Sequence, residues 1–152
     1  MATHLLKFCV LGSGSRGNSI AIHCNHSGVL IDCGLSAKET MKRLRKTGFD
    51  PGEFQTALVT HHHNDHTTCL RTLIERESLV NILATRQTIR GVQDKNEWLA
   101  AHPAVFTEIQ TRAPFFADAR RQIQAVAIPT VHNAEGAVTY VLRADGKKLA
   151  CY

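Results

Sequence analysis

Histidines and one aspartate crowd into a single short stretch of this chain, from His61 to His66. Four imidazoles and the carboxylate of Asp65 fall within these six consecutive residues. Imidazole nitrogens combined with a carboxylate oxygen suit zinc, and also iron or manganese. His61, His63 and Asp65 alternate along the chain, so an extended backbone would direct all three side chains to one side. The stretch therefore predicts a metal site.

The number of candidate ligands exceeds what one tetrahedral ion takes from a single loop. Their spacing is better explained by two adjacent ions, one held by His61 and His63, the other by Asp65 and His66. The alternatives are a surface histidine run, the remnant of a purification tag, or a capping loop. A tag would not contain an aspartate or follow a buried strand. His62 alternates away from its two neighbours and is expected to face outward.

Regular elements on both sides of the cluster are expected to hold it in place. Residues 56–60 are predicted to form a short buried strand, with an apolar, β-rich centre and polar ends. Leu70 and Leu73 belong to a helical pattern, and we expect a helix from His66 to Glu77. The cluster would then lie on a strand-to-helix loop, where side chains converge while rigid elements hold their backbones.

The rest of the chain alternates between predicted strands and helices. Strands are expected at residues 5–11, 18–23, 29–32, 81–84, 105–109, 122–128, 138–142 and 148–152, and helices at 36–46 and 85–101. Ser36 is the expected N-cap of its helix, with Glu39 three positions later completing a capping box. This order, without repeats or linkers, favours a single α/β domain with helices outside β-sheets.

A glycine-rich segment follows the first predicted strand. Residues 12–17 match the pattern Gly-x-Gly-x-x-Gly, which is typical of dinucleotide sites when a helix begins there. Here a strand, a turn and another strand follow instead, so the sequence argues against a nucleotide-binding crossover. The glycines are expected to form a tight polar turn between strands.

Several groups of residues resemble the metallo-β-lactamase fold hydrolases. The stretch from Thr60 to His66 is similar to their His-x-His-x-Asp-His signature, and residues 30–34 resemble their strand ending in Asp-x-Gly. Residues 129–132 lie where the family has its next metal-binding histidine. Residues 11–18 resemble the Ser-Gly-Ser-x-Gly-Asn opening of the bacterial YycJ/WalJ-like branch, whose members are described as metal-dependent nucleases or phosphodiesterases. The resemblance implies the αββα sandwich of that family.

The resemblance implies roles for residues around the cluster. His132 would be the third ligand beside His61 and His63. Asp32, at the end of its strand, would accept a hydrogen bond from a ligand histidine. The implied cofactor is zinc, with two ions in the family and one or two here, and manganese is the alternative metal.

The implied chemistry is hydrolysis by a metal-activated water. A water between two ions would be acidified toward neutral pH, and Asp65 would orient it or take its proton. The glycine-rich turn lies near the metal site in the family, so Ser15 or Asn18 would either approach a substrate phosphate or serve only the turn. The YycJ/WalJ-like opening favours phosphodiesters in nucleic acid, and a glyoxalase-type thioesterase is the alternative enzyme.

Composition and charge narrow these interpretations. A net charge of +5 and a pI of about 9.1 suit a polyanionic substrate, although a solvated helix face is the more common explanation for the basic residues 42–46. Five scattered cysteines without a Cys-x-x-Cys pair fit reduced thiols in a cytoplasmic protein. We expect neither a membrane span nor a secretory signal. The remaining histidines are expected to be ordinary surface residues: His4, His23, His26 and His102.

The chain departs from the family pattern at its C-terminal end. In the family, the strand that matches residues 148–152 is followed by Thr-Asp-x-Gly, whose aspartate bridges the ions, and a later histidine completes the second site. The sequence ends at Tyr152, so we expect an incomplete sandwich whose second ion keeps only Asp65 and His66. The exposed sheet edge would favour oligomerisation. The alternatives to an active hydrolase are a truncated chain of weak activity, a non-catalytic metal-binding protein, or one completed by another chain.

Overall fold

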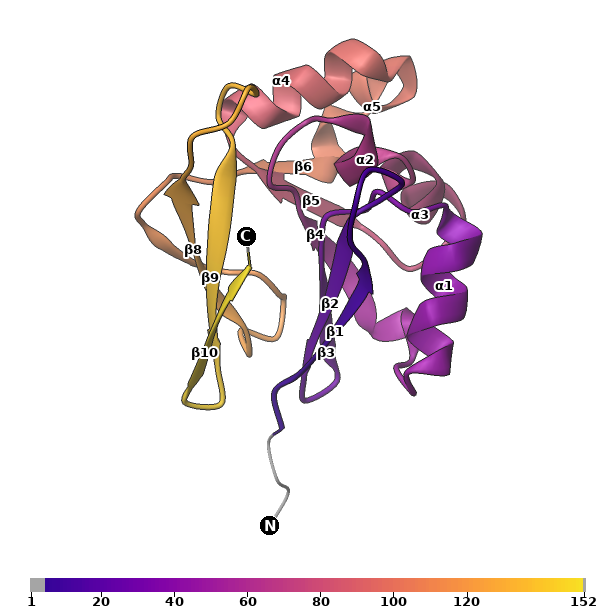
Figure 1. The fold of residues 1–152 in the computed structure, drawn as a ribbon, viewed down its shortest axis with the longest axis vertical. Helices are drawn as coiled ribbons and strands as arrows, with labels where there is room; N and C mark the ends of the chain where they lie inside the picture. The colour runs from indigo at the N-terminus through magenta and orange to yellow at the C-terminus, as the bar shows by residue number, and fades with distance from the viewer. Residues whose placement is uncertain (1–4, 152) are drawn as a thin grey trace.

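The computed structural model describes residues 5–151, which stack in three layers: helices, a six-stranded sheet and a four-stranded sheet (Figure 1). The strand order is β1-β2-β3-β4-β5-β6 in the first sheet and β10-β9-β8-β7 in the second. The structure therefore contains an α layer and two β layers of the predicted αββα sandwich. Among the described residues, no second helical layer covers the outer face of the four-stranded sheet, in agreement with the predicted incomplete sandwich.

The first sheet begins as two hairpins and continues as parallel strands. Its antiparallel strands are β1 (Lys7–Gly12), β2 (Ser19–Cys24) and β3 (Ser27–Ile31), and its parallel strands are β4 (Phe54–Leu58), β5 (Asn81–Ala84) and β6 (Phe106–Glu108). All five residues of β3 are buried, as expected for a central strand covered on both faces. The two hairpins confirm that no nucleotide-binding crossover follows the glycine-rich turn.

The helices lie on the outer face of this first sheet. They are α1 (Ala37–Lys46), α2 (Asn64–Thr67), α3 (Leu70–Arg76), α4 (Arg86–Lys95) and α5 (Glu97–Ala101), with short 3-10 turns at Pro51–Glu53 and Pro103–Val105. Ser36 caps α1 by accepting a hydrogen bond from the Glu39 amide at 3.2 Å, as predicted. The Glu39 carboxylate instead accepts from Arg43 at 2.7 Å, so that pair takes the place of the second half of the capping box.

Two predicted helices are each divided in the structure. The helix predicted for residues 66–77 consists of α2 and α3, which are separated at Thr68 and Cys69. The helix predicted for residues 85–101 is interrupted at Asn96, whose side chain accepts a hydrogen bond from the Leu99 amide at 3.0 Å and caps α5. Asparagine in a cap competes with helix continuation, and this local effect overrides the apolar periodicity.

The second sheet is antiparallel throughout. It comprises β7 (Pro114–Phe116), β8 (Gln124–Pro129), β9 (Val138–Ala144) and β10 (Lys147–Cys151). The turn between β9 and β10 is formed by Asp145 and Gly146 with φ values of 50° and 69°, as expected for a two-residue hairpin. The sequence pattern did not predict β7, because this three-residue edge strand begins with proline and has no extended alternation.

The two sheets enclose an apolar core, and Tyr140 lies at its centre. This β9 side chain is fully buried, and its hydroxyl donates a hydrogen bond of 2.8 Å to the carbonyl oxygen of Val59. Burial raises the pKa of Tyr140 well above its usual value, which keeps the hydroxyl protonated as a donor. Because Val59 directly follows β4 and precedes the histidine cluster, this bond fixes the start of the cluster against the second sheet.

The cysteines are not joined to one another in the structure. Four of them, Cys24, Cys33, Cys69 and Cys151, are buried, and Cys9 is partly exposed. All five are free thiols in the structure. In the part of the chain that the structure describes, no helix has the length and apolar character needed to cross a bilayer.

Candidate metal centre

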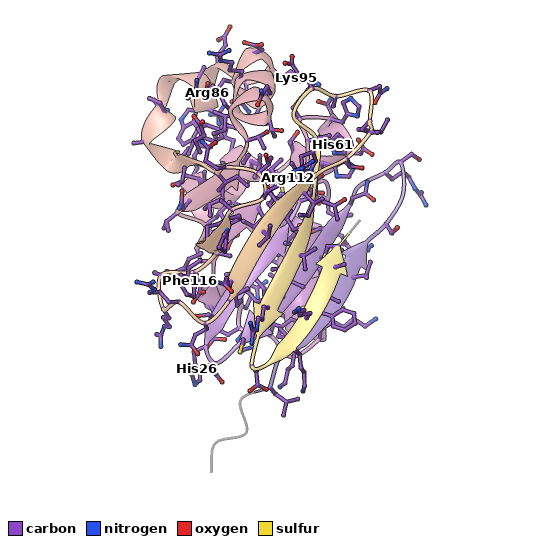
Figure 2. The ribbon with its side chains drawn as sticks, turned by 90° about the vertical axis from the view of Figure 1, so that its left-hand side faces the viewer. His26, His61, Arg86, Lys95, Arg112 and Phe116 are labelled. Atoms are coloured by element: carbon purple, nitrogen blue, oxygen red, sulfur yellow. The ribbon has the colours of Figure 1, made fainter. Side chains whose placement is uncertain are left out.

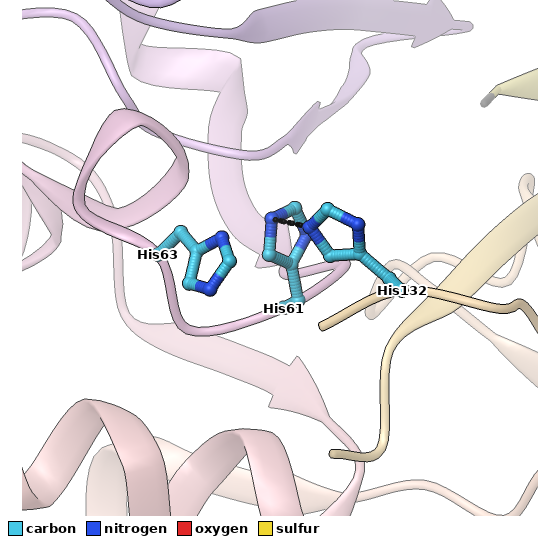
Figure 3. A group of neighbouring side chains, drawn as sticks. All are labelled: His61, His63 and His132. Atoms are coloured by element: carbon cyan, nitrogen blue, oxygen red, sulfur yellow. Dashed lines mark hydrogen bonds between the residues drawn. The ribbon is translucent and has the colours of Figure 1, made fainter. Parts of the chain in front are cut away.

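Three predicted ligands converge between the two sheets. His61 and His63 lie on the segment after β4, and His132 comes from the connection between β8 and β9 (Figure 3). Their candidate ligand atoms all lie within 4.8 Å of one another, and the Nε2 atoms of His61 and His132 are 3.2 Å apart. Each sheet thus contributes to one three-nitrogen group, which suits zinc.

The neighbours of His61 leave its Nε2 lone pair free for a metal. The Thr60 hydroxyl donates to Asp32 Oδ2 at 2.7 Å, so its oxygen can accept a hydrogen from His61 Nδ1, which lies 2.9 Å away. His61 is only 8% exposed, and burial together with the nearby His66 lowers its pKa to about 3. The ring is therefore neutral near physiological pH, as a metal ligand must be, and these residues fit a divalent cation.

Asp32 lies behind the ligands as a shared hydrogen-bond acceptor. Its carboxylate accepts from the Thr60 amide at 2.8 Å, from the Thr60 hydroxyl, and from His66 Nδ1 at 2.7 Å. The structure thus places Asp32 against a candidate ligand histidine. Burial raises the pKa of Asp32, and its bonds to His66 and Thr60 partly offset that rise. Burial opposes the charge on His66, but the bond to Asp32 and the charge of that carboxylate outweigh it, so the pKa of His66 is raised.

Asp65 and His66 form a second pair of candidate ligands beside the first group. His66 Nε2 lies 3.5 Å from Asp65 Oδ2, and the rings of His61 and His66 are 4.0 Å apart between centroids. Within the described residues, the three histidines His61, His63 and His132 are the one group of three or more candidate ligands that meets at a point. Asp65 and His66 therefore provide a half-site next to a fuller one.

The cluster faces a cavity of about 560 Å³ between the sheets. Five candidate ligands line it, and Val10, Ile20, Val131 and Cys151 supply apolar parts of its wall. The predicted turn residue Asn18 also lines the cavity and contacts Asp65, whereas Ser15 is exposed on the same turn. A cavity with a few polar groups in an apolar wall is the usual form of a substrate site.

The His62 side chain was expected to face outward, but it packs against a helix. It does point away from the ligand group, but its ring packs on Gly91 of α4, where an added Cβ would overlap it. Its Nδ1 atom is buried without a hydrogen-bond partner among the described residues, and its carbonyl accepts from Lys95 at 3.2 Å. Burial and the charge of Lys95 lower the pKa of His62. Its physical role is to dock the loop on α4, which an alternating pattern cannot reveal.

The prediction of ordinary surface histidines is wrong for His23. The His23 ring is largely buried, stacks on Phe49 with centroids 5.4 Å apart, and shares the Glu53 carboxylate with His26. His26 remains largely exposed, at the end of the sheets opposite His61 (Figure 2). His102 is exposed but stacks on Trp98 and bonds to the Trp98 carbonyl oxygen. His4 lies outside the described residues.

Thr60 has a role in this site that its position in the sequence did not predict. The sequence indicated Thr60 only as the last residue of a strand, although its hydroxyl connects Asp32 to His61. The available signal was a hydroxyl residue directly before the first ligand histidine, at the end of a buried strand. A sequence pattern cannot show that Asp32 lies 28 positions earlier yet within hydrogen-bond distance.

A histidine-rich loop after a central strand, facing a histidine from a second sheet, is typical of α/β sandwiches with a metal site. The sequence profile described as "Metallo-beta-lactamase superfamily" matches residues 12–142. The chain therefore belongs to the metallo-β-lactamase superfamily, and the fold and resemblance expected from the sequence are confirmed.

Individual relatives resemble parts of the chain. Exodeoxyribonuclease WalJ of Streptococcus pneumoniae serotype 2 is 37% identical over 60 residues, which cover 40% of this chain and 22% of that protein. Exodeoxyribonuclease YycJ of Bacillus anthracis is 35% identical over 74 residues, covering 49% of this chain and 28% of that protein. The matched stretches therefore span less than a third of either relative.

A solved B3 metallo-β-lactamase with an active-site glutamic acid has the same fold. It superimposes with a TM-score of 0.73 at 18% identity, and the match covers 94% of this chain but 57% of that one. The similarity shows that nearly all of this chain adopts this fold, while it corresponds to little more than half of the length of that β-lactamase chain.

Proposed function

We propose that this chain is a metal-dependent hydrolase of phosphodiester bonds in nucleic acid, with DNA as the first substrate to test. The convergence of His61, His63 and His132 beside Asp65 and His66 carries the proposal. The matches to two exodeoxyribonucleases and the net charge of +5 favour a nucleic-acid substrate. Zinc fits the nitrogen ligands best, and manganese is the alternative.

The three histidines would hold the first ion, and Asp65 with His66 a second. A bound metal would supply acidification of a water molecule and would neutralise charge on the phosphoryl oxygens. The chain's own residues prepare this chemistry. Thr60 holds His61 in the tautomer that presents Nε2, and Asp65, with a side chain 34% exposed, is available to orient a water or take its proton.

The cavity and its surroundings suggest how a substrate binds. Ser15 is exposed on the turn that reaches the cavity through Asn18, and we retain Ser15 as a candidate contact to a substrate phosphate.

The five free cysteines fit a reducing compartment, which supports a cytoplasmic location. The edge of β10, together with the 58% exposed Phe8 on the edge strand β1, favours assembly with another chain, which light scattering of the purified protein would detect.

The test is cleavage of end-labelled single- and double-stranded DNA by protein reconstituted with zinc or manganese. We expect cleavage that is lost on chelation and falls about 10²–10⁴-fold in Asp65→Ala, as for removal of a catalytic acid or base. His26→Ala, at the opposite end of the sheets, is the matched control and keeps full activity. Equal cleavage by the wild type and Asp65→Ala would exclude this site as the source of activity.

Two alternatives have separate signatures in the same experiment. Hydrolysis of a small thioester but not of DNA would identify the thioesterase class. Binding of one ion per chain, with hydrolysis of neither substrate, would identify a metal-binding protein that lacks the groups a second ion needs. The half-site formed by Asp65 and His66 makes the number of ions bound per chain the first quantity to measure.

A further inference from the structure

The side chain of Asn18 lies against the pair of residues proposed to hold a second ion. Asn18 ends the turn after β1 and directly precedes the first residue of β2. Its Nδ2 atom lies 3.2 Å from Asp65 Oδ2 and 3.2 Å from His66 Nε2. These are the side-chain atoms through which Asp65 and His66 would bind a metal.

The turn itself fixes which way the Asn18 amide faces. The Gly14 amide donates to Asn18 Oδ1 at 2.9 Å, and Asn18 Nδ2 donates to the Gly14 carbonyl oxygen at 2.9 Å. An amide oxygen only accepts and an amide nitrogen only donates, so rotating the group by half a turn would break both bonds. The nitrogen is therefore the atom that faces Asp65 and His66.

The hydrogen-bond partners of His66 match this orientation. Because Nδ1 of His66 faces Asp32 at 2.7 Å, the neutral ring carries its hydrogen there and presents the lone pair of Nε2. The Asn18 nitrogen also lies 3.3 Å from the Asp65 carbonyl oxygen, in addition to its contact with the carboxylate. One amide hydrogen is directed to the Gly14 carbonyl oxygen, so the other is shared among three acceptors of the metal loop: the Asp65 carbonyl oxygen, Asp65 Oδ2 and His66 Nε2.

Backbone contacts secure the same junction independently of the side chain. The Asn18 amide donates to the Asp65 carbonyl oxygen at 2.7 Å, and the Gly34 amide donates to the Asn18 carbonyl oxygen at 2.9 Å. These bonds survive a change of side chain at position 18. The role of the carboxamide can therefore be tested without removing the link between the turn and the loop.

We infer that Asn18 is a positioning residue, whose carboxamide nitrogen holds Asp65 Oδ2 and His66 Nε2 toward one point in the metal-free chain. Without a metal, the Asn18 amide donates to the lone pairs of Asp65 Oδ2 and His66 Nε2 that a cation would use. Nε2 has one lone pair, so its contact with Asn18 gives way to a cation, whereas the carboxylate has further lone pairs and keeps its contact. This inference rests on the proposed metal-dependent function, because positioning the two groups serves to bind a metal. Under it, Asn18 positions metal ligands and does not contact the substrate.

The first experiment measures backbone hydrogen exchange in metal-free protein. Asn18→Ala removes the carboxamide, and Asn18→Asp keeps its size but replaces the donating nitrogen by an acceptor. Both variants are expected to exchange the amides of residues 65–69 roughly tenfold faster, as loss of about one net hydrogen bond allows. The matched control is Asn81→Ala, which removes a 3.0 Å bond to Thr107 on β6 and leaves this exchange unchanged. Unchanged exchange in both Asn18 variants overturns the inference.

The second experiment titrates the metal-free proteins with Co²⁺ and follows its absorption spectrum. Asn18→Ala is expected to weaken the second equivalent about 10–100-fold, the usual effect of removing a group that orients ligands, while the first equivalent is unaffected. Equal affinities for a second equivalent in wild type and variant overturn the inference. If the wild type binds only one equivalent of Co²⁺, the hydrogen-exchange experiment alone tests the inference. Failure of the wild type to cleave DNA would refute the proposed function but would leave both readouts intact.

Discussion

The hydroxyl oxygen of Thr60 lies 2.7 Å from a carboxylate oxygen of Asp32 and donates its hydrogen to it. The same oxygen lies 2.9 Å from His61 Nδ1 and accepts the ring hydrogen. Asp32 also accepts from His66 Nδ1. One buried carboxylate therefore sets the tautomers of a histidine in each half of the candidate metal centre, directly for His66 and through a hydroxyl for His61.

Replacing Thr60 by valine tests this relay with little change of shape. Thr60→Val is expected to reduce affinity for the first ion about 10–100-fold, because His61 loses the group that fixes its tautomer. The buried Asp32 also loses a donor, which costs about 1–3 kcal/mol of unfolding free energy. Competition with a chromophoric chelator measures the affinity. The control is Thr107→Val, an exposed threonine that bonds to Asn81, and affinity equal to wild type in Thr60→Val would refute the relay.

Gly34→Ala is expected to displace the metal loop. A Cβ at Gly34 would overlap the Asp65 carbonyl oxygen and would press on the Asn18 amide nitrogen, and backbone atoms cannot rotate away as a side chain can. We expect a loss of about 2 kcal/mol or more in urea unfolding and loss of binding to the second half-site. The control is Gly146→Ala, which loses stability only because its backbone φ is 69°. No atom lies within 4 Å of its new methyl group. Equal destabilisation of the two variants would contradict the overlap.

His132→Ala is expected to abolish stabilisation by metal. A cation that binds only the folded chain adds about 2.7 kcal/mol at a hundredfold excess over its dissociation constant. His132 comes from the second sheet, so its removal leaves His61 and His63 without the ligand that joins the two halves of the site. Thermal unfolding with and without zinc gives the measurement. His26→Ala should retain the full zinc-dependent shift, and a persistent shift in His132→Ala would show that the ion binds elsewhere.

The ligands were predictable from sequence because most of them are close together in the chain. His61, His63, Asp65 and His66 share one loop, and their types alone indicate a metal. His132 was inferred only by resemblance to a family, because its neighbours in space are 69 to 71 positions away. A contact over that distance depends on how two sheets pack, and no local propensity encodes it.

Other features could not be predicted because they depend on contacts between residues, which the local sequence pattern does not show. By contrast, the six strands of the first sheet were all expected near their observed positions. The split of residues 66–77 into α2 and α3 follows from backbone bonds that Cys33 makes to His66 and Cys69, which periodicity does not contain. The glycine-rich turn was recognised as a turn, but the direction of the Asn18 amide depends on its bonds to Gly14.

Glu53 provides a test of acid stability away from the metal centre. Its carboxylate accepts hydrogen bonds from His23 and His26. Burial raises the pKa of Glu53, but the bonds and charges of the two histidines outweigh it, so the pKa lies below the usual 4.5. A lowered carboxyl pKa stabilises the fold above pH 4.5, and this contribution disappears as the pH falls through the folded-state pKa.

Glu53→Gln should therefore unfold more easily than the wild type near neutral pH, by about 1 kcal/mol. The difference should shrink as the pH is lowered below 4.5, because the wild-type carboxyl then becomes protonated and neutral like the amide. Urea unfolding of both proteins at a series of pH values measures the difference, and other carboxyl groups cancel in it. Glu77→Gln, at an exposed position after α3, is the control and should show no such convergence. A difference that stays constant down to the acid limit would show that the histidine pair does not stabilise the ionised carboxylate.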